Sequence, residues 1–289
     1  MAKENLQGVL YVVATPIGNL EDMTYRAVRV LKEADLIACE DTRQTQKLLD
    51  HYGIKKPTVS YHEHNEQQRA QELITKLQEG RTVALVSDAG MPGISDPGYR
   101  VVTLAIGHGV RVVPIPGASA LIAAVAASGL PTDAFEFQGF LPAKSGQRRT
   151  MLESLRGLQH SVVVYEAPHR IRETLQDIAE ILGPRTPVVI ARELTKIHEE
   201  FLRGRASEVL AAIESRELKG EITLLIGQAE TAQHSPAENL EARLQAIMKD
   251  QQLDEKAALK ALAKEQGRSK SEIYRELQRV QGRSSAKRK

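Results

Sequence analysis

The sequence predicts an α/β fold made of two successive α/β halves and a small basic helical segment. Short runs rich in β-branched residues alternate with longer amphipathic stretches through the first 117 residues, as in a parallel sheet covered by helices. Between residues 118 and 229 there are fewer helices per strand. Residues 230–289 contain 13 Lys and Arg against 9 Asp and Glu, whereas the rest of the chain contains 26 against 28. We therefore expect domains at 1–117 and 118–229 and a basic helical appendage at 238–289.

The first half is expected to hold five strands with helices between them. The strands are predicted at Val9–Ala14, Leu36–Cys39, Thr58–Tyr61, Val83–Ser87 and Val110–Pro114, and the helices at Thr24–Ala34, Thr42–His51, Glu66–Glu79 and Tyr99–Gly107. Parallel sheets with helices on both faces bind ligands at the carboxyl ends of their strands. The loops after these strands are therefore where a site is expected.

The second half opens with a helix of small residues, Ala118–Gly129. Further strands are predicted at Phe135–Gly139, Ser161–Tyr165, Pro187–Ala191 and Ile222–Gly227, with helices near Gln147–Leu158, at Pro168–Leu182 and at Ala206–Ser215. This mixture favours a sheet with at least partly antiparallel pairing. The segment QAETAQHSPAEN, poor in large apolar residues, is the predicted linker to the C-terminal helices.

The C-terminal segment is expected to contain helices at Leu240–Lys249 and Asp254–Glu265, and a third after the turn Gln266-Gly267-Arg268. Ser269 and Glu272 have the spacing of a capping box at the start of that third helix. Two short helices around a glycine turn, with Arg268, Lys270, Arg275 and Arg279 on or beside the second, resemble a helix-turn-helix. A helical hairpin docked on the body or on a partner, with a solvated basic tail, is an equal alternative.

Composition and motifs exclude several classes of protein. The single cysteine, Cys39, excludes an intrachain disulfide framework and Cys-rich metal sites, and the absence of a signal peptide or long apolar run favours a cytoplasmic protein outside the membrane. Neither the dinucleotide fingerprint nor a P-loop is present. His62-Glu63-His64 lacks the spacing of a zinc motif, so no metal is expected.

Three loops rich in Gly and Pro follow predicted strands of the first half. They read ATPIGNLED after the first strand, SDAGMPGISDPG after the fourth and PIPGASA after the fifth. Glycine and proline allow close approach of backbone groups to a ligand while the turn stays rigid. Any one of these loops can be a structural turn, but three at one edge of a sheet favour a shared site.

These loops, together with CEDTR (Cys39–Arg43), YEAPHR (Tyr165–Arg170) and ARELTKIHEE (Ala191–Glu200), give the sequence a resemblance to a known family. The chain resembles the tetrapyrrole-methylase-like S-adenosylmethionine methyltransferases, and within them the bacterial ribosomal RNA small-subunit methyltransferase I family. That family consists of 16S ribosomal RNA cytidine 2′-O-methyltransferases. The resemblance covers about Leu10 to Gly227, and the C-terminal helices also look like the family's appendage.

The resemblance implies two α/β domains of the tetrapyrrole-methylase type with S-adenosylmethionine in the cleft between them, and a homodimer. The ATPIGNLED loop departs from the glycine-rich loop of porphyrin-type relatives, which argues against a tetrapyrrole substrate. The residues that the resemblance places at the cofactor are Pro16, Ser87, Asp88, Ala89, Gly90, Met91, Ile94, Ser119, Ala120, Tyr165, Leu224, Leu225 and Ile226, with Arg192 as a further candidate. For Asp88 the alternative role is a cap of the following turn.

Methylation of a ribose hydroxyl needs a group that takes up or holds its proton. Asp41 and Glu193 stand at predicted strand ends near the expected cleft, and we take them as candidate bases, although each has an arginine neighbour with which it can form a plain ion pair. Glu40, Glu166 and His169 are similar in position.

Ribosomal RNA, free or in the small subunit, is the implied partner and requires cations outside the cofactor cleft. The candidate phosphate contacts are Arg43, Lys144, Arg148, Arg149, Arg170 and Arg172, besides the basic C-terminal segment. The run Pro142–Arg149 is expected to be a mobile basic loop, poorly ordered without RNA.

Two alternatives to an RNA ribose methyltransferase remain open from the residues alone. One is a methyltransferase of a small molecule such as a tetrapyrrole, which leaves the basic appendage without a role. The other is a non-enzymatic nucleic-acid-binding protein in which the helix-turn-helix does the binding. Saturable cofactor affinity distinguishes the last alternative from the two enzymes.

Overall fold

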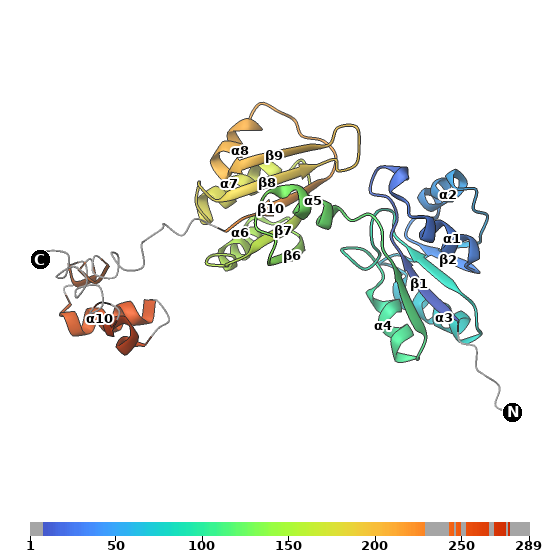
Figure 1. Ribbon diagram of the computed structural model, residues 1–289, viewed down its shortest axis with the longest axis horizontal. Helices are drawn as coiled ribbons and strands as arrows, with labels where there is room; N and C mark the ends of the chain where they lie inside the picture. The colour runs from blue at the N-terminus through green and yellow to red at the C-terminus, as the bar shows by residue number, and fades with distance from the viewer. Residues whose placement is uncertain are drawn as a thin grey trace, which may run out of the picture. The chain divides into compact units, whose positions relative to one another are not determined.

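The computed structural model describes residues 8–228 and, in the C-terminal segment, 243–245, 247–249, 253–265, 269–275 and 277. The chain separates into two compact units, residues 1–229 and 230–289. Figure 1 shows that the larger unit contains two sheets, each covered by helices. Among the described residues, no helix has the length and apolar character needed to span a membrane.

The first sheet is entirely parallel, with strand order β3-β2-β4-β1-β5. Its strands are β1 (Val9–Val13), β2 (Leu36–Cys39), β3 (Thr58–Ser60), β4 (Val83–Val86) and β5 (Arg111–Ile115). The intervening helices are α1 (Tyr25–Glu33), α2 (Thr42–His51), α3 (Glu66–Gln78) and α4 (Tyr99–Gly107), and a short 3-10 helix, η1, covers Leu20–Asp22. Each predicted strand and helix of this half is confirmed to within two residues at either end.

The helices cover both faces of the first sheet. Leu73 of α3 and Val101 of α4 pack with Leu10 and Leu85 on one face. On the other face, apolar residues of α1 and α2 pack against Val13, Ile37, Ala84, Val86 and Ile115. Because both faces are buried, the central strands are apolar throughout and all four residues of β4 are buried.

The second sheet has the order β6-β7-β10-β8-β9 and mixes parallel with antiparallel pairs. Its strands are β6 (Phe135–Phe140), β7 (Ser161–Glu166), β8 (Pro187–Arg192), β9 (Glu200–Arg205) and β10 (Ile222–Ile226). The predicted antiparallel pairing is confirmed, since β10 runs against both β7 and β8. The edge strand β9 was not predicted, because its sequence EFLRGR lacks the run of apolar residues that marked the other strands.

Helices α6 (Ser145–Ser154), α7 (Ile171–Ile181) and α8 (Ala206–Ala212) cover one face of this sheet. Helix α5 (Ala120–Ser128) packs on the other face. Successive side chains of β7 point to opposite faces of the sheet. Val162 and Val164 therefore pack in the core beneath α6, α7 and α8, and Val163 packs in the core beneath α5. Ile17, from the loop after β1, also packs in the α5 core and so ties the first half to the second.

The expectation of a mobile loop at residues 142–149 is wrong. Residues from Ser145 onward form α6, which begins two residues before the helix predicted near Gln147. Leu152 is fully buried, and Arg148 is only 2% exposed because it pairs with α7. Arg148 and Arg149 of the run therefore fasten α6 to α7.

The second unit has a small apolar core of its own. Helix α10 (Glu255–Glu265) supplies Leu259 and Leu262, and Ile273 from the helical residues 270–275 packs with them. The predicted capping box is confirmed, since the Ser269 backbone nitrogen donates to Glu272 and the Glu272 nitrogen donates to Ser269 Oγ. The predicted linker beyond Gln228, the turn at 266–268, Arg279 and the basic tail lie outside the described residues.

Candidate active site

The loops that follow β1 and β4 are joined at the carboxyl edge of the first sheet. Thr15 and Gly90 form an antiparallel bridge, with nitrogen-to-oxygen distances of 2.9 and 3.1 Å. The Thr15 hydroxyl also donates to the carbonyl oxygen of Ser87 at 3.1 Å. These bonds hold two of the three Gly- and Pro-rich loops together, as the sequence predicted for a shared site.

Two glycines make this arrangement possible. Gly90 has a φ of +78°, in the left-handed region that favours glycine. Gly117, in the loop after β5, lies against Ala14, and a Cβ at this position would come within 2.9 Å of the Ala14 Cβ. The third loop thus approaches the first more closely than any other residue at 117 would allow.

The second half meets these loops with the carboxyl end of β7 and the beginning of β10. In the pairing of these strands Ile222 is opposite both Glu166, the last residue of β7, and Arg192, the last residue of β8. Because β10 is antiparallel to both neighbours, its first residues lie at the edge where β7 and β8 end. Tyr165 is held there by edge contacts with the rings of Phe137 and Phe140, at centroid distances of 5.0 and 5.5 Å.

A cavity of about 360 Å³ lies between these elements. The loop after β4 contributes Ala89, Gly90, Met91 and Ile94, and the second half contributes Tyr165, Ala167 and Thr223 among others. Its volume is within the range of about 300–1,000 Å³ that is usual for small-molecule sites. The lining is mostly apolar side chains and bare backbone. The residues that line it are Ile17, Ala89, Gly90, Met91, Ile94, Ser95, Asp96, Ser119, Ala120, Phe140, Tyr165, Glu166, Ala167, Pro168, Ala191, Leu194, Gly220, Glu221, Ile222 and Thr223.

A second cavity, of about 770 Å³, adjoins the first. Ser95 and Asp96 belong to the walls of both cavities. The second is lined by residues of α3, α4 and the loop before α4, among them Gln67, Gln71 and Tyr99, whose side chain is largely exposed, as well as Glu40, Glu63 and Glu66. Two binding spaces therefore meet at residues 95–96.

Seven of the residues that the resemblance places at a cofactor line the first cavity: Ala89, Gly90, Met91, Ile94, Ser119, Ala120 and Tyr165. Ser119 also begins α5, since its hydroxyl accepts a hydrogen bond from the Ile122 nitrogen at 3.4 Å. Pro16 precedes the lining residue Ile17, and Ser87 is buried at the end of β4. For these residues the cofactor role stays a prediction.

The structure places the other predicted cofactor residues differently. Leu224, Leu225 and Ile226 are buried in the core of β10, and Ile222 and Thr223 stand in the cavity wall instead, because the strand runs antiparallel to its neighbours. Arg192 pairs with Glu200 at 3.2 Å and donates to the Lys219 carbonyl oxygen at 3.0 Å, outside the lining.

The Asp88 carboxylate bonds to the end of a neighbouring strand rather than to the turn that follows it. One of its carboxylate oxygens accepts a hydrogen bond from the Asp41 nitrogen at 3.1 Å, which joins the ends of β2 and β4. Asp88 does not belong to the cavity wall.

Neither candidate base has the environment that a base requires. Asp41 caps α2 by accepting from the Arg43 nitrogen at 2.8 Å, and hydrogen bonds from the Arg43 side chain lower the pKa of Asp41 to about 2. The Glu193 side chain accepts from Lys196 at 2.8 Å, and this bond lowers its pKa. Both groups lie outside the cavity wall, so both predictions are disfavoured by the geometry.

Asp96 is a site residue that our reading of the sequence missed. It lies in the SDPG end of the loop after β4, and desolvation by burial raises its pKa above the ordinary value, although the nearby Ser87 side chain opposes the change. Desolvation also raises the pKa of Glu40. A signal was present, since a carboxylate between turn residues in a suspected ligand loop is a candidate by itself.

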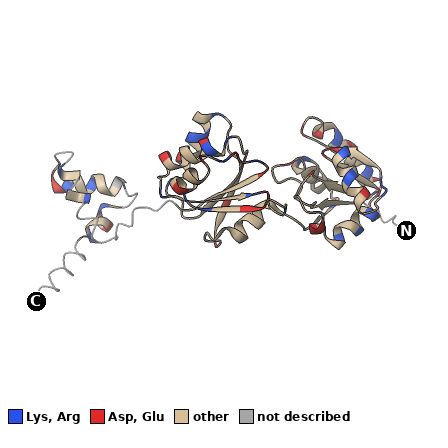
Figure 2. Cartoon of the chain, turned by 90° about the horizontal axis from the view of Figure 1, so that it is seen from above, with Lys and Arg blue, Asp and Glu red and all other residues tan. Residues whose placement is uncertain are grey.

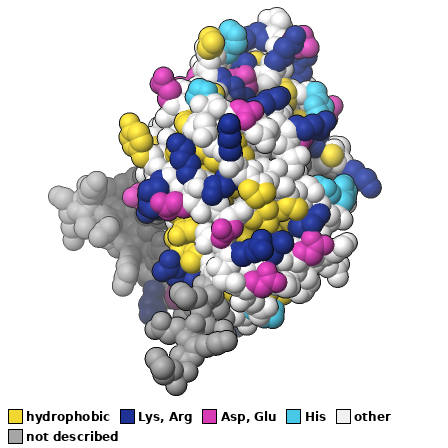
Figure 3. Space-filling model, turned by 90° about the vertical axis from the view of Figure 1, so that its right-hand side faces the viewer, with side chains coloured by type: hydrophobic (Ala, Val, Ile, Leu, Met, Phe, Trp, Pro, Cys, Tyr) yellow, Lys and Arg dark blue, Asp and Glu magenta, His cyan; other side chains and the backbone are white. Residues whose placement is uncertain are grey.

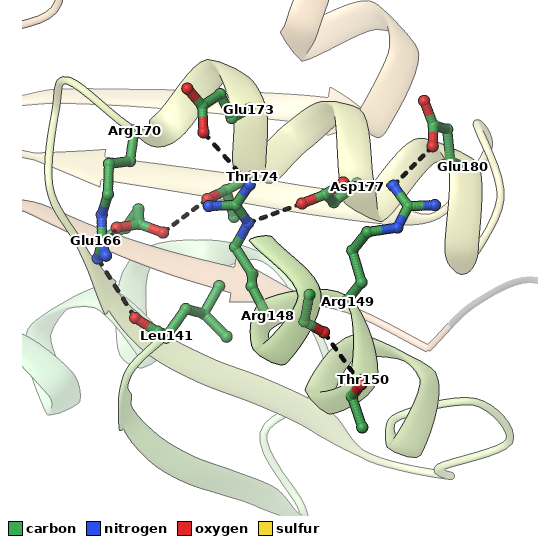
Figure 4. A network of polar contacts seen from close by, with 11 residues as sticks. Leu141, Arg148, Arg149, Thr150, Glu166, Arg170, Glu173, Thr174, Asp177 and Glu180 are labelled. Atoms are coloured by element: carbon green, nitrogen blue, oxygen red, sulfur yellow. Dashed lines mark hydrogen bonds and ion pairs between the residues drawn. The ribbon is translucent and has the colours of Figure 1, made fainter. Parts of the chain in front are cut away.

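Three of the predicted phosphate contacts are held by carboxylates of the protein itself (Figure 4). The buried Arg148 donates to Asp177 at 2.7 Å, and Arg149 donates to the same carboxylate at 2.6 Å and to Glu180 at 2.8 Å. Arg170 pairs with Glu166. The prediction for Arg148 is wrong, because a side chain that is 2% exposed does not reach RNA.

The remaining cations are on the surface. Lys144 is exposed, the Arg43 side chain is 87% exposed, and Arg172 donates to the carbonyl oxygens of Ile213 and Glu214 at 3.2 and 2.6 Å. Figure 2 shows Lys and Arg on helices of both halves, with Asp and Glu between them. On the face drawn in Figure 3, basic and acidic side chains are likewise intermixed. Within the described ranges no group of three His, Cys, Asp or Glu residues is arranged to hold a metal ion.

Comparison with known proteins agrees with this geometry. Residues 9–210 match the family model described as Tetrapyrrole (Corrin/Porphyrin) Methylases. The chain is 56% identical over 220 residues to Ribosomal RNA small subunit methyltransferase I of Halalkalibacterium halodurans, covering 76% of each chain. It is 50% identical over 244 residues to the protein of the same name from Synechocystis, covering 83% of this chain and 87% of that one. The chain belongs to the ribosomal RNA small subunit methyltransferase I family.

A more distant solved structure shows the same fold as this methyltransferase I family member. Uroporphyrin-III C-methyltransferase of Thermus thermophilus, solved in complex with S-adenosyl homocysteine, matches with a TM-score of 0.53 at 21% identity, covering 77% of this chain and 98% of that one. The predicted family and the tetrapyrrole-methylase type of α/β fold are thereby confirmed.

Proposed function

We propose that the protein transfers a methyl group from S-adenosylmethionine to the ribose 2′-hydroxyl of a cytidine in the RNA of the small ribosomal subunit. The observation that carries this function is the cavity at the meeting of the two halves, in a chain that is 56% identical to a named ribosomal RNA methyltransferase. The family fits a methyltransferase that acts on RNA of the small subunit. The ribose oxygen and the cytidine are the finer parts of the proposal.

The residues of the first cavity fit S-adenosylmethionine. Its mostly apolar wall and the bare backbone at Ala89–Gly90 suit the flat adenine ring of the cofactor, and the carboxylates of Asp96 and Glu221 in the wall suit its cationic groups. The cofactor supplies an activated methyl group when bound. A related fold has been solved with the demethylated cofactor, which supports a fold that can bind it.

The protein's own contribution is to orient the reactants and exclude water. Backbone amides and carbonyls of the loops after β1 and β4 are held by the Thr15–Gly90 bridge, so they need no reorganisation when a ligand arrives. Tyr165, packed on Phe137 and Phe140, closes the cavity from the second half. Alignment and dehydration of this kind suffice for an in-line displacement once the hydroxyl has lost its proton.

The substrate follows from the family and from the second cavity. The curated relatives are named for ribosomal RNA. We propose naked RNA or the assembled small subunit as the partner, with Lys144, Arg43, Arg172 and the partly exposed Arg149 as phosphate contacts, and a homodimer in the cytoplasm as the working form. A tetrapyrrole substrate is disfavoured because the relatives at 56% and 50% identity are named for ribosomal RNA, and a pure binding protein because a cofactor-sized cavity is present.

The test is methyl transfer followed by analysis of the product. The full chain is incubated with methyl-labelled S-adenosylmethionine and small ribosomal subunits, or their purified RNA, that lack ribose methylation. We expect label in RNA, inhibition by S-adenosyl homocysteine, and 2′-O-methylcytidine as the labelled nucleoside after nuclease digestion. Label on a base would refute the ribose assignment, and no label in either RNA would refute the function.

A further inference from the structure

Three carboxylates line the first cavity, and two of them are already engaged. Glu166 is fully buried, accepting hydrogen bonds from the Ala167 nitrogen and the Thr174 hydroxyl, each at 2.7 Å, as well as from Arg170. Glu221 pairs with Lys196 at 2.9 Å, and its side chain is 74% exposed. A carboxylate that is neutralised by a cation or saturated with donors is a poor proton acceptor.

Asp96 has no such cation partner. Over the described parts of the chain, no Lys or Arg forms an ion pair with it. The groups that face it are the side chain of Ser87, the carboxylates of Asp88 and Glu40, and Tyr165 from the second half. Desolvation and the negative charge of Asp88 both raise its pKa. A carboxylate in this environment binds a proton more tightly than a free one does.

The position of Asp96 is equally distinctive. It belongs to the walls of both cavities, so a group bound in one and a group bound in the other can each lie close to it. The preceding residue, Ser95, has a φ of +61°, a conformation that costs free energy in a residue other than glycine. Residues with strained backbone of this kind are enriched at functional sites, where the strain fixes the orientation of a side chain.

We propose that Asp96 is the general base of the reaction and that the target nucleoside reaches it from the second cavity. The inference rests on the proposed function. The 2′-hydroxyl proton passes to the Asp96 carboxylate while the 2′ oxygen bonds to the methyl carbon. The carbon–sulfur bond breaks, and its electron pair stays on sulfur, leaving a neutral thioether. The charges balance, because a carboxylate and a sulfonium are consumed together.

The second cavity suits the nucleoside rather than its phosphates. Its wall carries Glu40 and Glu63, which repel phosphate, and Glu66, which is paired with Arg100 of the same wall at 3.0 Å. Gln67 and the exposed ring of Tyr99 offer hydrogen bonds and a stacking surface to a base. A nucleotide that is extruded from its helix presents its base and its ribose to a binding site, and both are uncharged. The phosphates then remain outside, near the surface cations.

The main test compares Asp96→Asn with wild type at saturating S-adenosylmethionine and RNA. We expect single-turnover methyl transfer to fall by about 10²–10⁴-fold, the usual contribution of a positioned base. S-adenosyl homocysteine affinity, measured by calorimetry, should stay within about threefold of wild type, because the variant keeps the size of the side chain. Asp133→Asn, an exposed position outside both cavities, is the matched control and should transfer at the wild-type rate.

A readout independent of turnover is the titration of Asp96 itself. Carboxyl NMR of the cofactor-free protein should give Asp96 a pKa above the ordinary aspartate value of 3.8. A general base must be ionised to accept a proton. The rate of methyl transfer should therefore fall as the pH drops through the raised pKa of Asp96. Asp96→Glu should retain part of the activity with a shifted acidic limb, and it replaces Asp96→Asn if the latter fails to fold.

Three results would overturn the assignment. Transfer by Asp96→Asn within tenfold of wild type would show that Asp96 takes no proton, and a loss of S-adenosyl homocysteine affinity by more than tenfold would make it a binding residue. An ordinary or lowered pKa of Asp96 would also refute it. Failure of the proposed function is distinguishable, because then the wild type itself would form no 2′-O-methylcytidine.

Entry through the second cavity has its own test. Tyr99→Ala should raise the KM for RNA with little change in kcat, while Tyr99→Phe, which keeps the ring, should behave as wild type. Loss of one stacked base corresponds to about 1–3 kcal/mol, or roughly 5- to 150-fold in KM. An unchanged KM for Tyr99→Ala would place the nucleoside elsewhere.

Discussion

At the scale of single residues, burial decides what a charge does. Arg148 stands in a run of basic residues that suits contact with phosphate, yet it is buried against Asp177 and Glu173 and fastens α6 to α7. Asp96 is the opposite case, because its carboxylate comes from an ordinary turn motif and belongs to the walls of both cavities. Among the described residues it has no cation partner. The direction of each side chain follows from the elements packed around it.

We expect Arg148→Met to destabilise the protein by about 3 kcal/mol, because removing one member of a buried ion pair leaves the other carboxylate poorly compensated. The value is at the lower end of the usual range since Arg149 still pairs with Asp177. Urea unfolding measures the effect. Arg156→Met, at an exposed position just after α6, is the control and should cost less than about 0.5 kcal/mol. Equal stability of the two variants would contradict the buried role of Arg148.

At the scale of elements, strand ends and helix starts build the site. The loops after β1, β4 and β5 meet at one edge because parallel strands all end there, and β10 brings its beginning to the cavity because it runs the other way. Helix α2 starts beside this edge, with Asp41 as its cap and Asp88 holding the Asp41 nitrogen. A carboxylate cap of this kind stabilises the start of its helix through its negative charge as well as through its hydrogen bond.

The cap of α2 makes stability depend on acid pH. The pKa of Asp41 in the folded protein is about 2, below its ordinary value of 3.8. Its full contribution to the free energy of unfolding is therefore present above pH 3.8 and is lost as the pH falls toward 2. Asp41→Asn keeps a capping side chain but removes the charge. We expect this variant to be less stable than wild type at pH 6 and equally stable at pH 2, by chemical unfolding. A pH-independent difference would be inconsistent with the charge effect, and Asp50→Asn at the far end of α2 is the control.

At the scale of the whole molecule, the two cavities and the excess of basic residues belong to different units. Residues 1–229 form a compact unit that contains both sheets and both cavities, and residues 230–289 form another, with more basic than acidic residues. Among the described residues, those that line the first cavity all belong to the first unit. Cations outside a binding cleft strengthen RNA association through counterion release, which depends on salt.

A chain that ends at residue 229 should therefore keep S-adenosyl homocysteine affinity and lose part of its affinity for RNA. The logarithm of RNA affinity should fall less steeply with the logarithm of salt concentration than it does for the full chain, because fewer phosphate contacts are made. Filter binding at several salt concentrations measures the slope. An unchanged slope would assign no RNA contact to the C-terminal unit, and lost S-adenosyl homocysteine binding would contradict the independence of the first.

The strands and helices of the first half could be predicted from sequence, because a sheet buried on both faces leaves continuous apolar runs between amphipathic stretches. Strand β9 could not, since an edge strand that is only partly buried, such as EFLRGR, does not need such a run. The meeting of the three Gly- and Pro-rich loops was also predictable, since they follow strands that end at one edge. Six of the residues that the resemblance placed at the cofactor in these loops line the first cavity, and their cofactor role stays a prediction.

Local patterns in the chain determined the fold class, the order of elements and the family, because these depend on the periodicity of apolar residues and on motifs a few residues long. Only the tertiary structure decided which charges are buried, that Ile222 and Thr223 rather than Leu224, Leu225 and Ile226 border the cavity, and that Asp96 stands between two binding spaces. These facts depend on strand direction and on contacts between residues far apart in sequence, which set the burial and the electrostatic surroundings of each side chain.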